Sequence, residues 1–201
     1  MVKSSKRFML TYIIIALNIA IYAYTSALGG DFIETNYDVI KQYGQVNFFV
    51  IYRGWYWQLF TSMFIHVNII HLLGNMFFLL IFGFRAEEMF SIPEYLLIYF
   101  LSGLAGNLLT LLLGSNMISA GASGAIFGVF GACTIYIRRT IGQSIITALM
   151  YAFFLFMINI GPGVNVLAHL GGLVVGLLFG YVLATKRKVR TAHKFSYNYS
   201  V

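Results

Sequence analysis

The sequence predicts an all-α membrane protein that folds as one domain, residues 1–201, with six helices crossing the bilayer. Three observations lead to this prediction. Hydrophobic residues make up 60% of the chain and charged residues only 9%, whereas a soluble domain has about 25% charged residues. The mean hydropathy is +0.82. The apolar residues also gather in runs, most of which approach the ~20 residues that a helix needs to cross a bilayer.

The apolar runs give the predicted spans in chain order. The first, residues 8–28, follows three basic residues and is longer than the ~7–15 residues of a signal peptide core, so we interpret it as a retained helix. A cleaved signal peptide is the alternative. The remaining spans are residues 65–84, 95–113, 123–137, 141–160 and 164–185. Residues 186–201 form a basic tail that we expect to be cytoplasmic and to face lipid.

A large outer loop joins the first two spans. It contains the aromatic stretch FFVIYRGWYWQLF at residues 48–60. Aromatic side chains favour the membrane interface, so we expect part of this loop to lie in the headgroup layer. An ordinary aromatic belt is the alternative interpretation.

The basic residues predict the orientation. With both termini inside, eleven Lys and Arg residues lie on the inner side and two, Lys41 and Arg53, on the outer side. This bias is typical of a multi-pass protein with cytoplasmic termini, and we expect the plasma membrane. The net charge of +7 therefore reflects topology, and we expect the lipid bilayer rather than nucleic acid as a partner.

Polar side chains from three predicted helices fall at a common depth. Measured at ~1.5 Å per residue from the basic residue at each inner end, Ser123, His169 and His71 lie about 22, 25 and 21 Å away. All three are then roughly 5–10 Å beneath the outer face of a ~30 Å hydrocarbon layer. Asn75 follows His71 by four residues and shares its helix face. Polar groups at such depths usually mark function or helix contacts.

The acidic residues narrow the possible chemistry. The chain has only six, and none lies in a predicted span, so a serine protease here lacks an evident triad acid and would use a Ser–His pair. The histidines of HVNIIH (66–71) are five residues apart and lack the glutamate of a zinc protease, so the motif disfavours a zinc protease. A proton-coupled transporter usually needs buried carboxylates, which are missing.

Glycines predict how two of these helices meet. Gly124 and Gly128 are spaced four apart, as are Gly172, Gly176 and Gly180, and such spacing lets helix backbones touch. His169 shares its face with Gly172 and Gly176, so packing of the fourth helix there would bring Ser123 to His169. Packing alone remains the simplest meaning of this spacing.

The fourth span is short, and this predicts where it starts. Its fifteen residues reach only ~22 Å, so its N-terminus should lie below the outer surface, where unpaired N–H groups favour negative charge. An oxyanion in acyl transfer forms at such a place.

The motifs HVNIIHLLGN (66–75), GASG (121–124) and AHLGGLVVG (168–176), in this order, resemble the rhomboid family of intramembrane serine proteases. The resemblance implies a six-helix bundle with a submerged fourth helix. It implies that Ser123 is the nucleophile, that His169 is the general base, and that Asn75, His71 and the Ser123 N–H form an oxyanion hole. The family cleaves transmembrane substrate proteins near the outer ends of their helices, without metal or cofactor.

Supporting roles are implied for His66, Gly121, Gly124, Phe127, Gly172 and Gly176. Two positions depart from the family pattern. Gln58 stands where many members have arginine, and Phe127 stands where many have tyrosine, so an apolar ring without a hydroxyl faces the histidine.

Two function classes remain open. The first is the intramembrane serine endopeptidase, and the alternative is a non-catalytic rhomboid-like binder or small transporter. The sequence predicts neither the physiological substrate nor the oligomeric state. The fifth span and the loop NIGPGVN (159–165) are the candidates for a substrate gate, because glycine and proline make this connection breakable.

Overall fold

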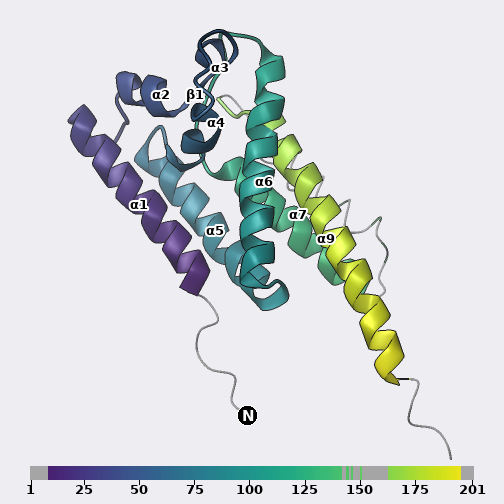
Figure 1. Ribbon diagram of the computed structural model, residues 1–201. Coiled ribbons are helices and arrows are strands. Elements are labelled where there is room, and N and C mark those ends of the chain that lie inside the picture. The colour runs from purple at the N-terminus through teal and green to yellow at the C-terminus, as the bar shows by residue number, and fades with distance from the viewer. Residues whose placement is uncertain (1–8, 142–143, 145, 147–149, 151–162, 196–201) are drawn as a thin grey trace, which may run out of the picture.

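The computed structural model describes residues 9–141, 144, 146, 150 and 163–195, and within them it is a bundle of long helices (Figure 1). The long helices are α1 (Met9–Gly29), α5 (Ile69–Met89), α6 (Ile92–Thr110), α7 (Ser123–Thr140) and α9 (Val166–Phe195). Four shorter helices lie between α1 and α5: α2 (Tyr37–Tyr43), α3 (Asn47–Arg53), α4 (Gln58–Thr61) and η1 (Ser62–Phe64). The single turn η2 (Leu111–Leu113) follows α6, and the two short strands are β1 (Gln45–Val46) and β2 (Ile118–Ser119).

Four segments of the described chain are long and apolar enough to cross a bilayer: Met9–Gly29, Ile69–Met89, Ile92–Leu113 and Val166–Arg187. The protein is therefore an all-α integral membrane protein, as predicted. Helix α7 coincides with the predicted fourth span but is less apolar, because Arg138 and Arg139 end it. The predicted fifth span, residues 141–160, lies almost wholly outside the described residues, so the count of six spans stays a prediction.

Several helix ends differ from the predicted ones. Helix α5 begins at Ile69, not at residue 65, because the Asn68 side chain caps it by accepting a hydrogen bond from the His71 N–H at 2.7 Å. Helix α9 runs to Phe195, so the first residues of the predicted basic tail are helical. Helix α7 is 18 residues long, three more than predicted.

Helices α7 and α9 touch along their backbones. A Cβ atom added to Gly172 would lie 1.9 Å from the Gly124 carbonyl oxygen, and one added to Gly176 would lie 1.9 Å from that of Gly128. No side chain fits into such a contact. The glycine spacing therefore predicts this interface correctly, and the two helices approach as closely as backbones allow.

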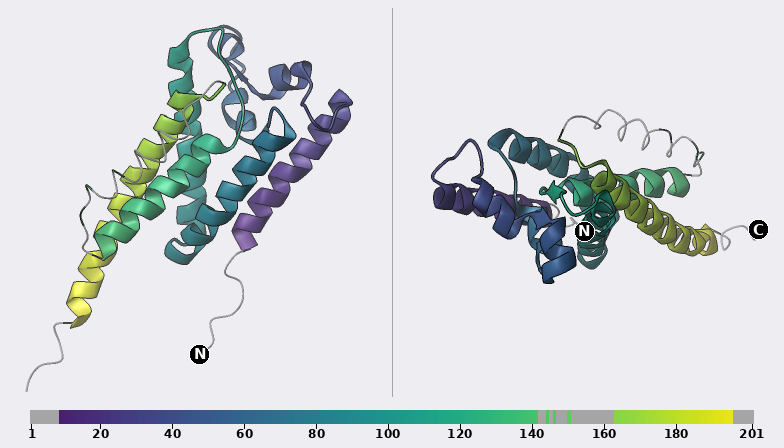
Figure 2. Two further views of the ribbon diagram at one scale, coloured as in Figure 1. Left: turned by 180° about the vertical axis from the view of Figure 1, so that it is seen from behind. Right: turned by 90° about the horizontal axis from the view of Figure 1, so that it is seen from above.

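The start of α7 lies deep in the bundle. Seen from behind, the chain descends from the upper end of α6 and enters α7 well below the upper ends of α6 and α9 (Figure 2). On the way, β2 pairs antiparallel with β1, with Gln45 opposite Ser119 and Val46 opposite Ile118. The Gly121 N–H then donates to the Ser62 carbonyl at 2.9 Å. The first outer loop thus holds the segment that leads into Ser123.

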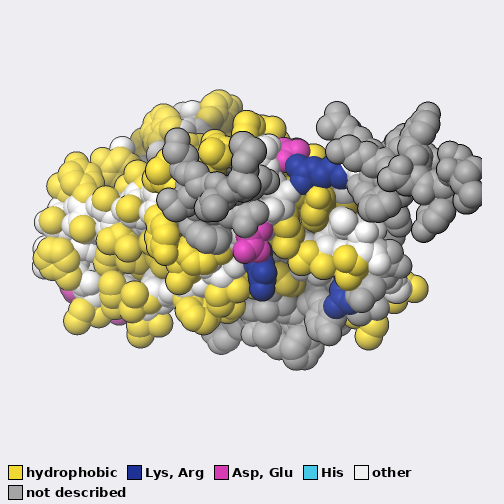
Figure 3. Space-filling view, turned by 90° about the horizontal axis from the view of Figure 1, so that it is seen from below, with side chains coloured by type: hydrophobic (Ala, Val, Ile, Leu, Met, Phe, Trp, Pro, Cys, Tyr) yellow, Lys and Arg dark blue, Asp and Glu magenta, His cyan; other side chains and the backbone are white. Residues whose placement is uncertain are grey.

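The opposite end of the bundle is the one where α1 begins and α9 ends (Figure 1). Seen from below, this end is mostly hydrophobic, with small groups of adjacent acidic and basic side chains (Figure 3). Arg187 of α9 pairs with Glu94 of α6 at 2.6 Å and donates to the Tyr136 hydroxyl of α7 at 2.9 Å and to the Met89 carbonyl. These contacts join α5, α6, α7 and α9 at the end of the bundle remote from the first loop.

Candidate active site

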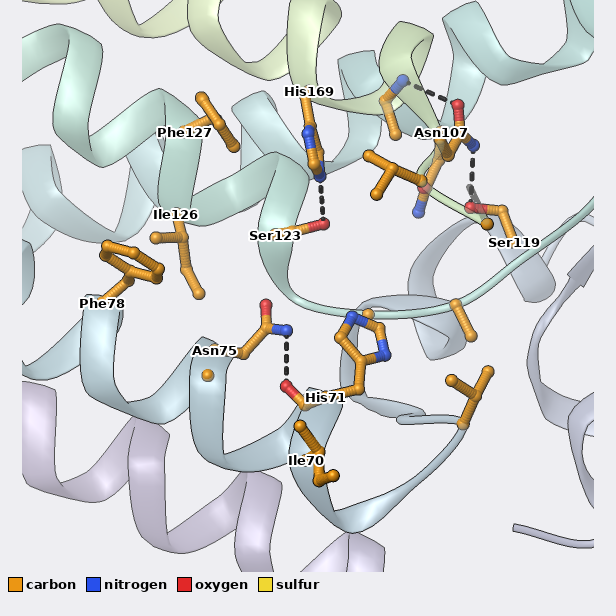
Figure 4. A pocket seen from close by; sticks show the side chains of 18 of the residues that line it. Ile70, His71, Asn75, Phe78, Asn107, Ser119, Ser123, Ile126, Phe127 and His169 are labelled. Carbon is orange, nitrogen blue, oxygen red and sulfur yellow. Dashed lines mark hydrogen bonds between the residues drawn. The ribbon is translucent and has the colours of Figure 1, made fainter. Parts of the chain in front are cut away.

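A cavity of about 350 Å³ opens between α5, α7 and the start of α9. Six of the predicted site residues line it. They are His71, Asn75, Gly121, Ser123, Phe127 and His169. The other four, His66, Gly124, Gly172 and Gly176, do not line it. Most residues that line it are apolar, and the Asn75 and His169 side chains point toward Ser123 (Figure 4).

Ser123 and His169 are joined by a hydrogen bond. The Ser123 Oγ lies 2.9 Å from the His169 Nε2. Ser123 is the first residue of α7 and His169 lies in the first turn of α9, so the close packing of the two helices brings these side chains together. The Phe127 ring, one turn after Ser123, stacks on the imidazole at 4.4 Å between centroids with an angle of 23°. The Phe127 ring covers one face of the imidazole and so restricts the orientation of its plane.

The backbone at the start of α7 is shaped for an anion. The first residues of a helix have N–H groups without intrahelical partners, and the helix dipole favours negative charge beside them. Gly121 precedes this turn with a φ of +128°, a conformation that side-chain-bearing residues rarely adopt. A Cβ there would also lie 2.7 Å from the Cε1 atom of His71. Gly121 therefore permits both the bend and the approach of the imidazole.

Helix α5 presents two polar side chains to the same space. The Asn75 Nδ2 donates to the His71 carbonyl at 2.8 Å, and the carboxamide head points toward Ser123 (Figure 4). Within the described part of the chain, the buried Asn75 Oδ1 has no hydrogen-bond partner. One Nδ2 hydrogen remains for a ligand, because an amide nitrogen carries two.

His66 lies behind this wall. Its side chain is fully buried and meets the edge of the His71 ring at 5.2 Å between centroids. Among the described residues, neither of its ring nitrogens has a partner. His66 therefore supports His71 from behind and does not reach the cavity.

No carboxylate contributes to the cavity. All six acidic residues of the chain lie in the described part, and none of them lines this space. No group of three or more His, Cys, Asp or Glu side chains among the described residues could hold a metal ion. The polar groups at hand are a hydroxyl, two imidazoles and amides.

Asn107 of α6 has a structural role and also a place in the cavity wall. Its Nδ2 donates to the Leu59 carbonyl at 2.7 Å and to the Ser62 Oγ at 2.9 Å, but the residue also lines the cavity. Gln58 is fully buried in the outer loop. Its side chain accepts from the Val46 N–H and donates to the Lys41 carbonyl, so a neutral amide braces the loop here.

Sequence reasoning missed Asn165, which lines the cavity and bonds to three segments. A signal was present, because an asparagine directly before an apolar helix is a common N-cap. Its other two contacts join residues 46 and 55 positions apart in the chain, which no local pattern indicates.

Comparisons with known proteins point to one family. The family model "Rhomboid domain" matches residues 53–186. "RHOMBOID-like protein 6, mitochondrial" of Arabidopsis thaliana is 41% identical over 133 residues, which cover 63% of this chain and 43% of that protein. "Rhomboid protease GluP" of Bacillus subtilis is 34% identical over 179 residues, covering 83% of this chain and 33% of the relative.

"Putative rhomboid protease YdcA" of Bacillus subtilis is 34% identical over 146 residues, covering 69% of this chain and 72% of the relative. The chain spans less than half the length of the plant relatives.

Proposed function

The chain belongs to the rhomboid family, and from this premise we propose that it is an intramembrane serine endopeptidase that hydrolyses peptide bonds in or near transmembrane segments. The single observation that carries the proposal is the hydrogen bond of 2.9 Å between the Ser123 Oγ and the His169 Nε2 inside the cavity. A nucleophile within reach of a base, with no acid in the cavity wall, is the arrangement that a Ser–His dyad requires.

Acylation begins when the Ser123 Oγ attacks the carbonyl carbon of the scissile bond. The His169 Nε2 accepts the hydroxyl proton, so His169 must carry its own proton on Nδ1 before the attack. The tetrahedral intermediate then collapses, the C–N bond breaks, and the protonated His169 gives its proton to the leaving amine. The products of this step are an ester on Ser123 and the released C-terminal fragment of the substrate.

Deacylation uses water. His169 takes a proton from a water molecule, the hydroxide attacks the ester, and the second tetrahedral intermediate expels the Ser123 oxygen, which regains its proton from His169. Water must reach the cavity from outside the lipid. Non-helical backbone inside a membrane is tolerated where it lines a watery space, and the descending residues 114–122 are suited to this.

Negative charge on the carbonyl oxygen has three candidate partners. They are the Ser123 N–H, the free hydrogen of the Asn75 Nδ2 and the His71 imidazole. Donors already directed at the place where charge develops stabilise the transition state without reorganising. Gly121 gives the loop its bend, Phe127 holds the His169 ring, and Gly124, Gly172 and Gly176 allow the helix contact on which the dyad depends.

The proposal includes the architecture around the site. Residues 1–201 form one membrane domain with six spans, and both termini face the cytoplasm because eleven of the thirteen basic residues then lie inside. The protein resides in the plasma membrane, and its partners are transmembrane-helix substrate proteins in the same bilayer.

The test uses the purified protein in liposomes with a labelled single-span substrate. The wild-type protein is expected to cleave it, and Ser123→Ala is expected to lose cleavage because, among the described residues, Ser123 supplies the hydroxyl that is paired with His169. A fluorophosphonate probe should label Ser123 in the wild type and fail to label it in His169→Ala. Cleavage by Ser123→Ala at the wild-type rate would reject the enzyme and favour a non-catalytic binder or transporter.

A further inference from the structure

Asn165 joins three segments of the site through one side chain. It precedes α9, and its Oδ1 accepts a hydrogen bond from the Ala168 N–H at 3.0 Å. Its Nδ2 donates to the Thr110 Oγ1 at the end of α6 and to the Ser119 Oγ of β2, both at 2.8 Å. The side-chain amide thus makes three of its four possible hydrogen bonds, and both of its amide hydrogens are used.

These segments are the ones that carry the nucleophile and the base. Ser119 lies four residues before Ser123 in the descending strand, and Asn165 lies four residues before His169 in the first turn of α9. The Asn165 carbonyl also accepts from the His169 N–H at 3.2 Å. The Ser119–Asn165 hydrogen bond therefore connects the segment that leads into Ser123 with the segment that leads into His169.

The donor and acceptor roles in these hydrogen bonds explain why position 165 needs an amide side chain. The Thr110 hydroxyl already donates to the Gly106 carbonyl at 2.9 Å, so toward Asn165 it can only accept. A donor is required at this position, and an aspartate would oppose the lone pairs of Thr110. Serine caps a helix about as well as asparagine, but its side chain is too short to reach Thr110 and Ser119 as well.

We propose that Asn165 is a positioning residue, which sets the distance between Ser123 and His169 by tying β2 and the end of α6 to the first turn of α9. The inference rests on the proposed function. It goes beyond capping of α9, because the two donated bonds act between segments and not within the helix. An error of about 1 Å in such a pair can cost on the order of 100-fold in rate.

The experiment separates capping from bridging. The variants are Asn165→Ser, which keeps a cap, Asn165→Ala, which keeps neither function, and Ser119→Ala, which removes one accepting partner. Asn36→Ser is the matched control, since Asn36 caps α2 by accepting from the Asp38 N–H and does not line the cavity. The readouts are kcat and KM for the liposome substrate, the rate of fluorophosphonate labelling and the Tm.

We expect Asn165→Ser to lower kcat and the labelling rate by about 10- to 100-fold, with KM within about twofold of wild type. Its Tm should stay near that of Asn36→Ser, because the cap remains. Ser119→Ala should lower kcat less, and adding it to Asn165→Ser should change little further, since both remove the same bond.

A kcat for Asn165→Ser equal to wild type, with a loss only in Asn165→Ala, would reduce Asn165 to a helix cap and overturn the inference. Additive effects of Asn165→Ser and Ser119→Ala would also overturn it. Failure of the proposed function looks different, because then the wild type itself neither cleaves the substrate nor reacts with the probe at Ser123.

Discussion

At the residue scale, some polar groups of the site pair with each other, and others have no hydrogen-bond partner and are open to a ligand. The Ser123 hydroxyl has His169, but the buried Asn75 Oδ1 and the His71 Nδ1 have no partner among the described residues. Unpaired polar atoms in an apolar wall are costly. The Asn75 Oδ1 can only accept, so it suits an N–H group of a bound peptide or a water molecule, whereas the second Nδ2 hydrogen of Asn75 suits a carbonyl oxygen.

Asn75→Ala tests this at a single side chain. Loss of one oxyanion donor should lower kcat by about 100- to 1,000-fold with little change in KM, because the bond forms only in the transition state. Asn18→Ala is the matched control. Its Nδ2 donates to the Ile14 carbonyl at 2.8 Å, four residues back in α1, just as Asn75 donates to the His71 carbonyl at 2.8 Å in α5.

Asn18 does not line the cavity, so its variant should show any loss of stability without the kinetic loss. Substrate turnover and Tm are measured for both. If Asn75→Ala turned over as fast as Asn18→Ala, Asn75 would not belong to the oxyanion hole.

At the element scale, the proposed catalysis depends on two helices that touch without side chains between them. Ser123 begins α7, and His169 lies in the first turn of α9, so the distance between them follows the distance between the helix axes. Gly124 and Gly172 meet close to the dyad, and Gly128 and Gly176 meet about one turn further in. Any atom added at these contacts must separate the helices.

Gly176→Ala should therefore lower the free energy of unfolding by about 1–3 kcal/mol, the usual cost of overpacking. Cleavage should fall as well, because α7 and α9 move apart. For stability, Gly74→Ala is the matched control, since a Cβ at Gly74 meets nothing within 4 Å and alanine favours a helix. A Tm of Gly176→Ala equal to that of Gly74→Ala would contradict this packing.

At the scale of the whole molecule, the cavity and the Arg187–Glu94 ion pair lie toward opposite ends of the bundle. The cavity lies toward the end that carries the first outer loop, whereas Arg187 ties α9 to Glu94 and Tyr136 at the other end. Helices α7 and α9 are thus held together at the end remote from the cavity. We expect this end to face the cytoplasm.

Single cysteines test the orientation. Lys41→Cys in the outer loop and Lys186→Cys near the end of α9 replace exposed residues, and the native Cys133 is buried. In intact cells a membrane-impermeant maleimide should label Lys41→Cys at once and Lys186→Cys only after permeabilisation, because eleven basic residues hold the inner loops inside. Labelling in the reverse order would invert the proposed topology.

The sequence carried much of the fold and of the candidate site, because their signals are local. Apolar runs predict membrane helices whatever they pack against, and a spacing of four predicts which residues share a helix face. Ser123, His169, His71 and Asn75 were recognisable from such patterns, and the structure brings them to one cavity. The start of the second span was predicted less accurately. Asn68 lies inside the predicted span, but its side chain caps α5, so the helix begins at Ile69 and not at residue 65.

By itself the sequence determined that this chain enters a membrane as helices and which polar side chains those helices carry. Only the tertiary structure decided the register that sets Gly172 on Gly124, the pairing of Gln45 with Ser119, and the bridge from Asn165 to Thr110 and Ser119. The physical reason is the distance along the chain over which each kind of signal acts. Hydropathy and helix periodicity act within a few residues, whereas these contacts join distant segments and exist only once the helices have packed.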